Sequence, residues 1–195
     1  MLERHVFRQD HGKGQGRIRQ SHSKDSADQG QLVGMTLGCR PNAHVQSMIW
    51  ATDRVGLETL LFPSEELKTK FFADLPPHDD TSPVPAPEVA GINACPHEYW
   101  KAVAIEVFAT PLIRSAGYEV DVLMTAYKSI PEYETACRDR GDGDVLNTGK
   151  YWDMSIHPYD SIFTKTNREH DAVTVDKYTE WAEVRKYSSY DYCNV

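Results

Sequence analysis

The chain has 195 residues, a length that suits one ordinary domain and is short for two. Apolar residues make up 40% of it and charged residues 26%, which is typical of a soluble globular protein. Its net charge of −8 argues against nucleic acid as a partner, because phosphate binding requires concentrated Lys and Arg. No window approaches the roughly 20 apolar residues of a membrane-spanning helix, so we expect no membrane span in this chain.

Residues 1–30 are polar and show neither helical nor strand periodicity. They hold six Lys/Arg against four Asp/Glu, whereas the remaining residues hold fifteen against twenty-five. They also lack the apolar core of a signal sequence. We therefore predict a disordered polar leader over residues 1–30, followed by an acidic folded region.

The four cysteines lie far apart and none belongs to a CxxC pair: Cys39, Cys95, Cys137 and Cys193. This spacing argues against a structural zinc site. Two interpretations remain open. Either all four are reduced thiols, or the protein passes through the secretory pathway and some of them pair.

Residues 31–61 begin with an apolar run and end in an amphipathic segment. Leu32–Leu37 predicts a buried strand, and Val45–Ala51 predicts a second strand. Thr52 or Asp53 can then cap a helix that runs to about Leu61.

The block from His44 to Asp53 mixes polar side chains with large apolar ones, and each polar group that is buried needs a hydrogen-bond partner. One interpretation is a half-buried strand whose outer face is wet. The other is the wall of a binding cleft, in which Gln46 and Ser47 would form hydrogen bonds with a polar ligand.

A helix that begins after Pro63, with Ser64 as its cap, is predicted to end near Phe72. Residues 74–92 contain five prolines and predict a surface loop. The next helix is predicted from a stripe of apolar residues: Trp100, Val103, Ala104, Val107, Phe108, Leu112 and Ile113. Gly117 would end this helix, and Pro111 predicts a kink or break near Ala109.

Tyr118–Ala126 predicts a strand buried on both faces at its end, and the order helix, glycine, strand indicates an α/β protein. We predict a short helix over Pro131–Cys137 and a loop over residues 138–149. Residues 151–168 are polar and aromatic and predict a loop that lines a cleft. Thr174 can cap a last helix with Tyr178, Trp181 and residues 184–185 on its inner stripe, before a tail over residues 186–195.

Four blocks carry a resemblance to a group of enzymes: LVGMTLGC, HVQSMIWATDRVGLETLL, EYWKAVAIEVFATPLIRSAGYEVDVLM and HPYDSIFTKTNR. Over about residues 31–185 the chain resembles the C-terminal half of largely uncharacterised fungal and plant glycosyltransferases of the GT-A type. The resemblance implies an α/β fold with a partial GT-A-like (nucleotide-diphospho-sugar transferase) sheet and flanking helices. In that group a nucleotide-binding half with an Asp-x-Asp metal motif would precede residue 31, so we expect a truncated chain.

The resemblance also implies metal-dependent transfer of a sugar from a nucleotide-sugar donor to a hydroxyl of a glycan or small-molecule acceptor. In such enzymes a helix supplies the general base, and Glu106 is at the similar position, although Val107 replaces the second acid of the usual pair. A late histidine completes the shell of a Mn²⁺ or Mg²⁺ cofactor, and His157 is the similar residue.

Five further residues would bind substrate: Gln46, Ser47 and Asp53 near the acceptor or donor sugar, and Lys165 and Arg168 at the diphosphate. The resemblance suggests the Golgi or secretory pathway, while this chain shows neither a signal nor an anchor.

Structural explanations stand beside these roles. Glu106 can be an exposed helix position or an ion-pair partner, His157 a structural hydrogen bonder, and the segment from Asp142 to Asp144 a turn. Two other functions are also compatible with the sequence. One is a catalytically inactive remnant that binds carbohydrate or protein, and the other is a metal-dependent hydrolase using Asp142, Asp144 and His157.

Overall fold

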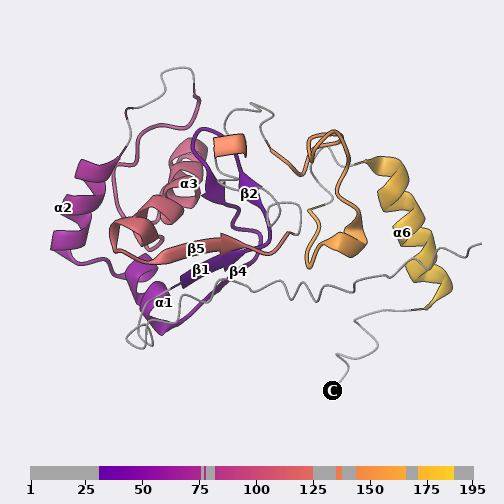
Figure 1. Ribbon diagram of the computed structural model, residues 1–195, viewed down its shortest axis with the longest axis horizontal. Helices are drawn as coiled ribbons and strands as arrows, with labels where there is room; N and C mark the ends of the chain where they lie inside the picture. Colours follow the sequence, from indigo (N-terminus) through magenta and orange to yellow (C-terminus); the bar gives the residue numbers. More distant parts are fainter. Residues whose placement is uncertain are drawn as a thin grey trace, which may run out of the picture.

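The computed structural model describes residues 31–75, 77, 82–124, 135–137, 144–165 and 171–186. Its main sheet has three strands in the order β4–β1–β5 (Figure 1). The central strand β1 (Gln31–Gly34) pairs antiparallel with β4 (Trp50–Thr52) and parallel with β5 (Glu119–Val122). Helices connect the parallel pair, so the described part of the chain is mixed α/β, as the sequence predicted. The GT-A type of sheet stays a prediction.

A second, two-stranded sheet pairs β2 (Leu37–Gly38) antiparallel with β3 (His44–Val45). The prediction of one strand over Leu32–Leu37 is therefore wrong, because the chain bends after Gly34 and the run is divided between β1 and β2. The bend brings Gly34 against β3 so closely that an added Cβ would lie 2.0 Å from Cγ1 of Val45. Only glycine fits at this crossing of the two sheets.

The predicted strand over Val45–Ala51 is also divided. Gln46 continues the ladder by donating its backbone N–H to the carbonyl of Thr36, and residues 47–48 then turn. The chain re-enters regular structure only at β4, in the other sheet. In this turn both donors of Ser47, the backbone N–H and the hydroxyl, bond to Glu106 of helix α3 (Tyr99–Ser115).

Helices α1 (Arg54–Leu61) and α2 (Glu65–Asp74) follow the predicted positions. Asp53 caps α1 by accepting from the backbone N–H of Gly56 at 2.7 Å. Ser64 caps α2 by accepting from the backbone N–H of Leu67 at 3.2 Å, and α2 runs two residues beyond Phe72.

Helix α3 (Tyr99–Ser115) is continuous through Pro111, so the predicted break near Ala109 does not occur. The residues from Val107 to Thr110, which precede the proline, are all buried. Their packing stabilises the helix and offsets the free-energy cost of a proline inside it. The stripe prediction fails at its first member, because Trp100 is 45% exposed in the opening turn. Gly117 adopts a φ of +85° directly after the C-cap, which confirms the predicted stop.

β5 is shorter than predicted and is not buried on both faces. Val122 and Met124 are buried, whereas Leu123 between them is 50% exposed. This alternation is that of a strand with one wet face. Residues 125 and 126 lie outside the described residues, as do residues 1–30 and 131–134.

The apolar side chains form two clusters. The larger joins both sheets to α1 and α3, through buried residues that include Leu32, Leu37, Val45, Leu60, Ile113 and Val122. The smaller lies between α2 and α3 around Phe71, Phe108 and Leu112. Helix α3 contributes to both clusters, so its orientation sets where its polar side chains point.

Beyond Asp144 the described chain is mostly irregular, apart from the short helix η1 (Pro158–Asp160) and helix α6 (Ala172–Val184) at one end of the molecule (Figure 1). The N-cap of α6 is Asp171 and not Thr174, since Asp171 accepts from the backbone N–H groups of Val173 and Thr174. The predicted inner stripe is wrong, because Tyr178, Trp181 and Val184 are 40%, 41% and 82% exposed. Among the described helices, none is long and apolar enough to cross a membrane.

Candidate functional site

One face of α3 presents polar side chains to β3 and the turn after it. Val45 donates its backbone N–H to Thr110 Oγ1 at 2.9 Å, and Ser47 donates its own to Glu106 Oε1 at 3.2 Å. Four residues of helix advance by about 6 Å and two residues of strand by about 6.6 Å. The two spacings nearly match, so the i,i+4 acceptors on the helix take the alternate N–H groups of the strand edge.

Ser47 binds Glu106 a second time, because its hydroxyl donates to the same Oε1 at 2.6 Å. Both residues are partly exposed, and among the described residues Oε2 receives no hydrogen bond. Burial raises the pKa of Glu106, but the two bonds from Ser47, with the charges of His44 in its protonated form and of Lys165, outweigh it and hold the pKa below its ordinary value. The carboxylate is therefore ionised at neutral pH.

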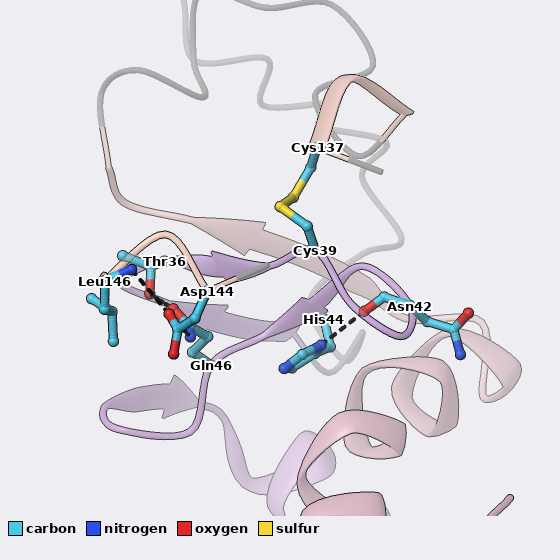
Figure 2. Close-up of a disulfide and its surroundings, with 8 residues drawn as sticks. All are labelled: Thr36, Cys39, Asn42, His44, Gln46, Cys137, Asp144 and Leu146. Atoms are coloured by element: carbon cyan, nitrogen blue, oxygen red, sulfur yellow. Dashed lines mark hydrogen bonds between the residues drawn. A yellow bond between two sulfur atoms is a disulfide. The ribbon is translucent and has the colours of Figure 1, made fainter. Parts of the chain in front are cut away.

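His44 is 7% exposed and lies beside this pair. Its Nδ1 is 2.8 Å from the carbonyl oxygen of Asn42, and a carbonyl only accepts, so Nδ1 carries the proton (Figure 2). Burial lowers the pKa of His44, against the opposing effects of the Asn42 bond and of the carboxylates of Glu106 and Asp144. The ring is neutral at pH 7, with the lone pair on Nε2. Its edge lies over Gly38, where an added Cβ would be 2.7 Å from Nε2.

The side chain of Gln46 binds partners other than Glu106. Its Oε1 accepts from the Thr36 hydroxyl, and its Nε2 donates to Asp144 Oδ1 at 2.8 Å. Asp144 Oδ1 also accepts from the backbone N–H of Leu146 at 2.9 Å. Figure 2 shows this chain of side chains on one side of the small sheet. The polar ends of Gln46 thus already have partners inside the protein, and its role toward a ligand stays a prediction.

The bond from Leu146 to Asp144 has the i to i+2 pattern of an Asx-turn, which confirms the turn interpretation at Asp144. Asp142 lies outside the described residues. The sequence did not indicate that Asp144 would reach Gln46. The contact spans 98 positions, and local patterns do not report pairings at that separation.

Cys39 and Cys137 form a disulfide with their Cα atoms 5.2 Å apart. This decides in favour of pairing between the two interpretations of the cysteines. Cys95 is a free, exposed thiol, and Cys193 lies outside the described residues. A disulfide is typical of proteins that fold in an oxidising compartment.

The predicted site residues do not all gather at Glu106. Ser47 contacts it, and Lys165 is near enough for its charge to lower the pKa of the carboxyl. Asp53 is at the N-terminus of α1 as its cap, His157 is exposed beside η1, and Arg168 lies outside the described residues. In the part of the chain that the structure describes, no three His, Cys, Asp or Glu side chains are arranged to hold a metal ion.

Two residues of the site were not singled out by the sequence: Thr36 and Thr110, both 0% exposed. Thr110 carried a usable signal, since a threonine inside a helix, four residues after an acid, places two acceptors on one face. Thr36 carried none, because it lies within an apolar run.

Three surface hollows lie away from this site. One of about 500 Å³ is lined by α1, α2 and the end of α3, and a second of the same size by residues 61–72 and 88–94. A third of about 380 Å³ lies at the start of α3 and includes Cys95. Neither Ser47 nor Glu106 lines any of the three.

Comparison with known proteins adds no relative: the sequence matches no protein-family model, no curated protein and no solved structure.

Proposed function

We propose that this chain carries the acceptor site of a nucleotide-sugar-dependent glycosyltransferase and still binds the nucleotide of the donor, with Glu106 as the group that receives the proton of the acceptor hydroxyl. The observation that carries the proposal is the fixed carboxylate. Two hydrogen bonds from Ser47 hold Oε1, while Oε2 receives none from the described residues. The four sequence blocks that resemble glycosyltransferases support the class of reaction.

In the proposed reaction the acceptor oxygen forms a bond to the anomeric carbon of the donor sugar. The bond from that carbon to the diphosphate breaks, and its electron pair leaves with the nucleoside diphosphate. The acceptor proton passes to Oε2 of Glu106. Such a positioned base contributes typically 10²–10⁴-fold to a rate.

The lowered pKa of Glu106 determines how this base would act. A carboxylate of low pKa is ionised at every pH near neutral and accepts a strong hydrogen bond from the hydroxyl in the ground state. It is also a weak base, so it gains the proton only after the oxygen has begun to bond to the sugar. Glu106 would therefore orient the acceptor first and accept its proton late.

The predicted Mn²⁺ or Mg²⁺ cofactor does not fit the described residues, because no donor set of three gathers around His157. We derive no step through a metal. Lys165, whose charge acts on Glu106, is the described cation that would face an anionic donor. A role for Arg168 at the diphosphate is part of the same proposal.

A second candidate function is a binding module that holds a sugar hydroxyl at Glu106 without transfer. The missing donor set for a metal among the described residues favours it, since a leaving diphosphate needs its charge neutralised. The two functions differ in their need for nucleotide.

Calorimetric titration of UDP and GDP into the folded full chain, with and without Mn²⁺, separates them. The transferase predicts nucleotide binding that survives Glu106→Gln, together with release of nucleoside diphosphate from a sugar nucleotide that falls at least 10²-fold in that variant. Glu180→Gln, on the exposed surface of α6, is the matched control and should change neither.

Absence of heat with both nucleotides, from a chain folded by circular dichroism, would exclude the transferase. Glycan binding that needs no nucleotide and is lost in Glu106→Gln would then support the module. A Glu106→Gln variant that binds nucleotide and glycan as the parent chain does, and releases diphosphate equally fast, would contradict both.

A further inference from the structure

Helix α6, at one end of the molecule beside η1, has no buried face (Figure 1). None of its thirteen residues is buried, and Val173 and Val184 near its two ends are 61% and 82% exposed. A helix of this length is only marginally stable in water by itself, and most helices in proteins are stabilised by the packing of an apolar face. Contact with a further surface would supply that packing to α6.

The apolar residues of α6 follow helical spacing. Its exposed face carries residues separated by four, four and three positions, which places them in one line along the helix: Val173, Lys177, Trp181 and Val184. Tyr178 borders this line, and its ring centroid lies 6.0 Å from that of Trp181. We call these five residues the α6 stripe. It is the kind of surface with which helices pack against one another.

We propose that the α6 stripe is an interaction surface for a second copy of this chain. The two α6 helices would pack antiparallel, about a two-fold axis that passes between residues 178 and 179. The proposal is independent of the transferase activity, because α6 contributes no residue to the Ser47–Glu106 site. For the same reason, association through α6 should leave nucleotide binding and diphosphate release unchanged.

The sequence of α6 is complementary to its own reverse. In a two-fold pair, residue i of one copy lies opposite residue j of the other, and j lies opposite i. An axis between residues 178 and 179 places Val173 opposite Val184 of the second copy, so the apolar ends of the stripe meet twice. The same axis places Lys177 opposite Glu180 of the second copy, again twice.

The opposite charges also lie on matching edges of the two helices. Glu180 comes three positions after Lys177 and therefore borders the stripe on one side. A two-fold axis perpendicular to both helices brings each edge of the stripe against the same edge of the second copy, so Lys177 and Glu180 meet. The ion pairs among the described residues include neither of them, so the contact displaces no existing pair.

The charge balance of α6 favours a second copy over other partners. Residues 171–186 hold four Asp/Glu against three Lys/Arg, whereas the whole chain has a net charge of −8. Two α6 helices therefore repel each other little, and physiological salt screens the charges of the remaining residues beyond about 8 Å. An anionic membrane surface favours a helix rich in Lys and Arg, and the mixed charges of α6 do not match that pattern.

The size of the stripe predicts a weak dimer. A helix of thirteen residues is about 20 Å long. Two such helices bury less surface than the roughly 1,200–2,000 Å² of a stable interface. Since interfaces of standard size have dissociation constants from micromolar to picomolar, we expect a value above about 1 µM for this pair.

Sedimentation equilibrium of the full chain tests the dimer, at concentrations from about 10 to 500 µM and with free thiols blocked by iodoacetamide. Val184→Asp should raise the dissociation constant at least about tenfold, because it places a charge in the apolar contact twice. Lys177→Glu and Glu180→Lys should each raise it about tenfold, since each sets like charges opposite one another at two places.

The double variant Lys177→Glu/Glu180→Lys restores both ion pairs with their signs reversed. Its dissociation constant should return to within about twofold of that of the parent chain. The control is Thr179→Lys, which adds a cation two positions after Lys177, on the side of α6 away from the stripe, and should change nothing.

A parent chain that stays monomeric at the highest concentration would overturn the proposal. Sedimentation of that monomer with phosphatidylserine vesicles would instead assign the stripe to a membrane surface. A dimer that is unaffected by Val184→Asp, or that the double charge variant does not restore, would overturn the pairing of the two α6 helices. If Val184→Asp lowers the helix content in circular dichroism, the charge variants still decide, because loss of helix cannot account for restoration in the double variant.

Discussion

Replacing Ser47 with alanine should raise the pKa of Glu106 and lower the stability of the protein in a pH-dependent way. The substitution removes the hydroxyl that donates to Oε1 at 2.6 Å and keeps the backbone donor at 3.2 Å. Hydrogen bonds to charged groups contribute roughly 1.5–3 kcal/mol, and partial exposure of both residues places this one at the low end. We expect the free energy of unfolding to fall by about 1–2 kcal/mol at pH 7.

The sign of the pH dependence follows from the direction of the pKa shift. The folded-state pKa of Glu106 is below its ordinary value of 4.5, so this group adds stability above pH 4.5 that is lost as the pH falls through the folded-state pKa. Ser47→Ala removes part of that stability. The cost of the substitution should therefore be larger at pH 7 than at pH 3.

Two measurements must agree if this reasoning holds. Urea unfolding at pH 7 and pH 3 gives the pH-dependent part of the cost, and a carboxyl-detected NMR titration gives the displacement of the Glu106 pKa. Each unit of displacement should correspond to about 1.4 kcal/mol. Ser64→Ala is the control, since it removes the cap of α2 and should leave the Glu106 titration unchanged. Equal costs at both pH values, with an unmoved Glu106 titration, would refute the assignment of the shift to Ser47.

Three further predictions concern the supports of the site. Gly34→Ala should lower the free energy of unfolding by about 1–3 kcal/mol, because its Cβ would meet Val45 Cγ1 at 2.0 Å. Adding Val45→Ala should recover part of that loss, as measured by chemical denaturation. His44→Asn should flatten the pH dependence of stability, because the lowered pKa of His44 makes stability fall as the pH drops below 6.5 and an amide does not titrate. An unchanged slope of stability against pH between pH 7 and pH 5.5 would count against this assignment. Asp53→Ala should cost about 1 kcal/mol by thermal unfolding through loss of the α1 cap, and Asp53→Ser should cost less.

The elements that the sequence predicted well are those governed by local chemistry. Asp53 and Ser64 begin α1 and α2 because a side-chain oxygen three residues before an amide can cap it, whatever the rest of the fold does. Gly117 ends α3 for a similarly local reason, its positive φ. At Asp171 and Thr174 the local signals competed, and the residue with two carboxylate oxygens became the cap.

The errors lie where distant segments decide the structure. Leu32–Leu37 is mostly apolar, and Gly34 alone does not indicate that the chain bends after it and contributes to two sheets. Apolar spacing predicted a buried face on α6, but Tyr178, Trp181 and Val184 on that face are 40%, 41% and 82% exposed. A periodic pattern reports which residues share a face and does not report what that face meets.

The candidate site was predicted in part. Glu106 and Ser47 were each singled out, yet for different reasons, and their contact joins residues 59 positions apart. No local pattern encodes that pairing. It follows from the spacing of the hydrogen-bonding groups. Glu106 and Thr110 on α3 accept at i and i+4, and the backbone N–H groups of Val45 and Ser47 donate at i and i+2. This match is seen only when the two segments lie side by side in the folded protein.

The two residues that follow β3, Gln46 and Ser47, each bind a different acid. Gln46 joins Asp144, whose Oδ1 also accepts from Leu146, so that acid is part of the internal structure. Ser47 joins Glu106, which keeps one oxygen without a hydrogen bond from the described residues. In each acid a single oxygen, Oδ1 of Asp144 or Oε1 of Glu106, accepts both of these internal bonds. A ligand hydroxyl that reached Oε2 of Glu106 would therefore not have to displace Ser47.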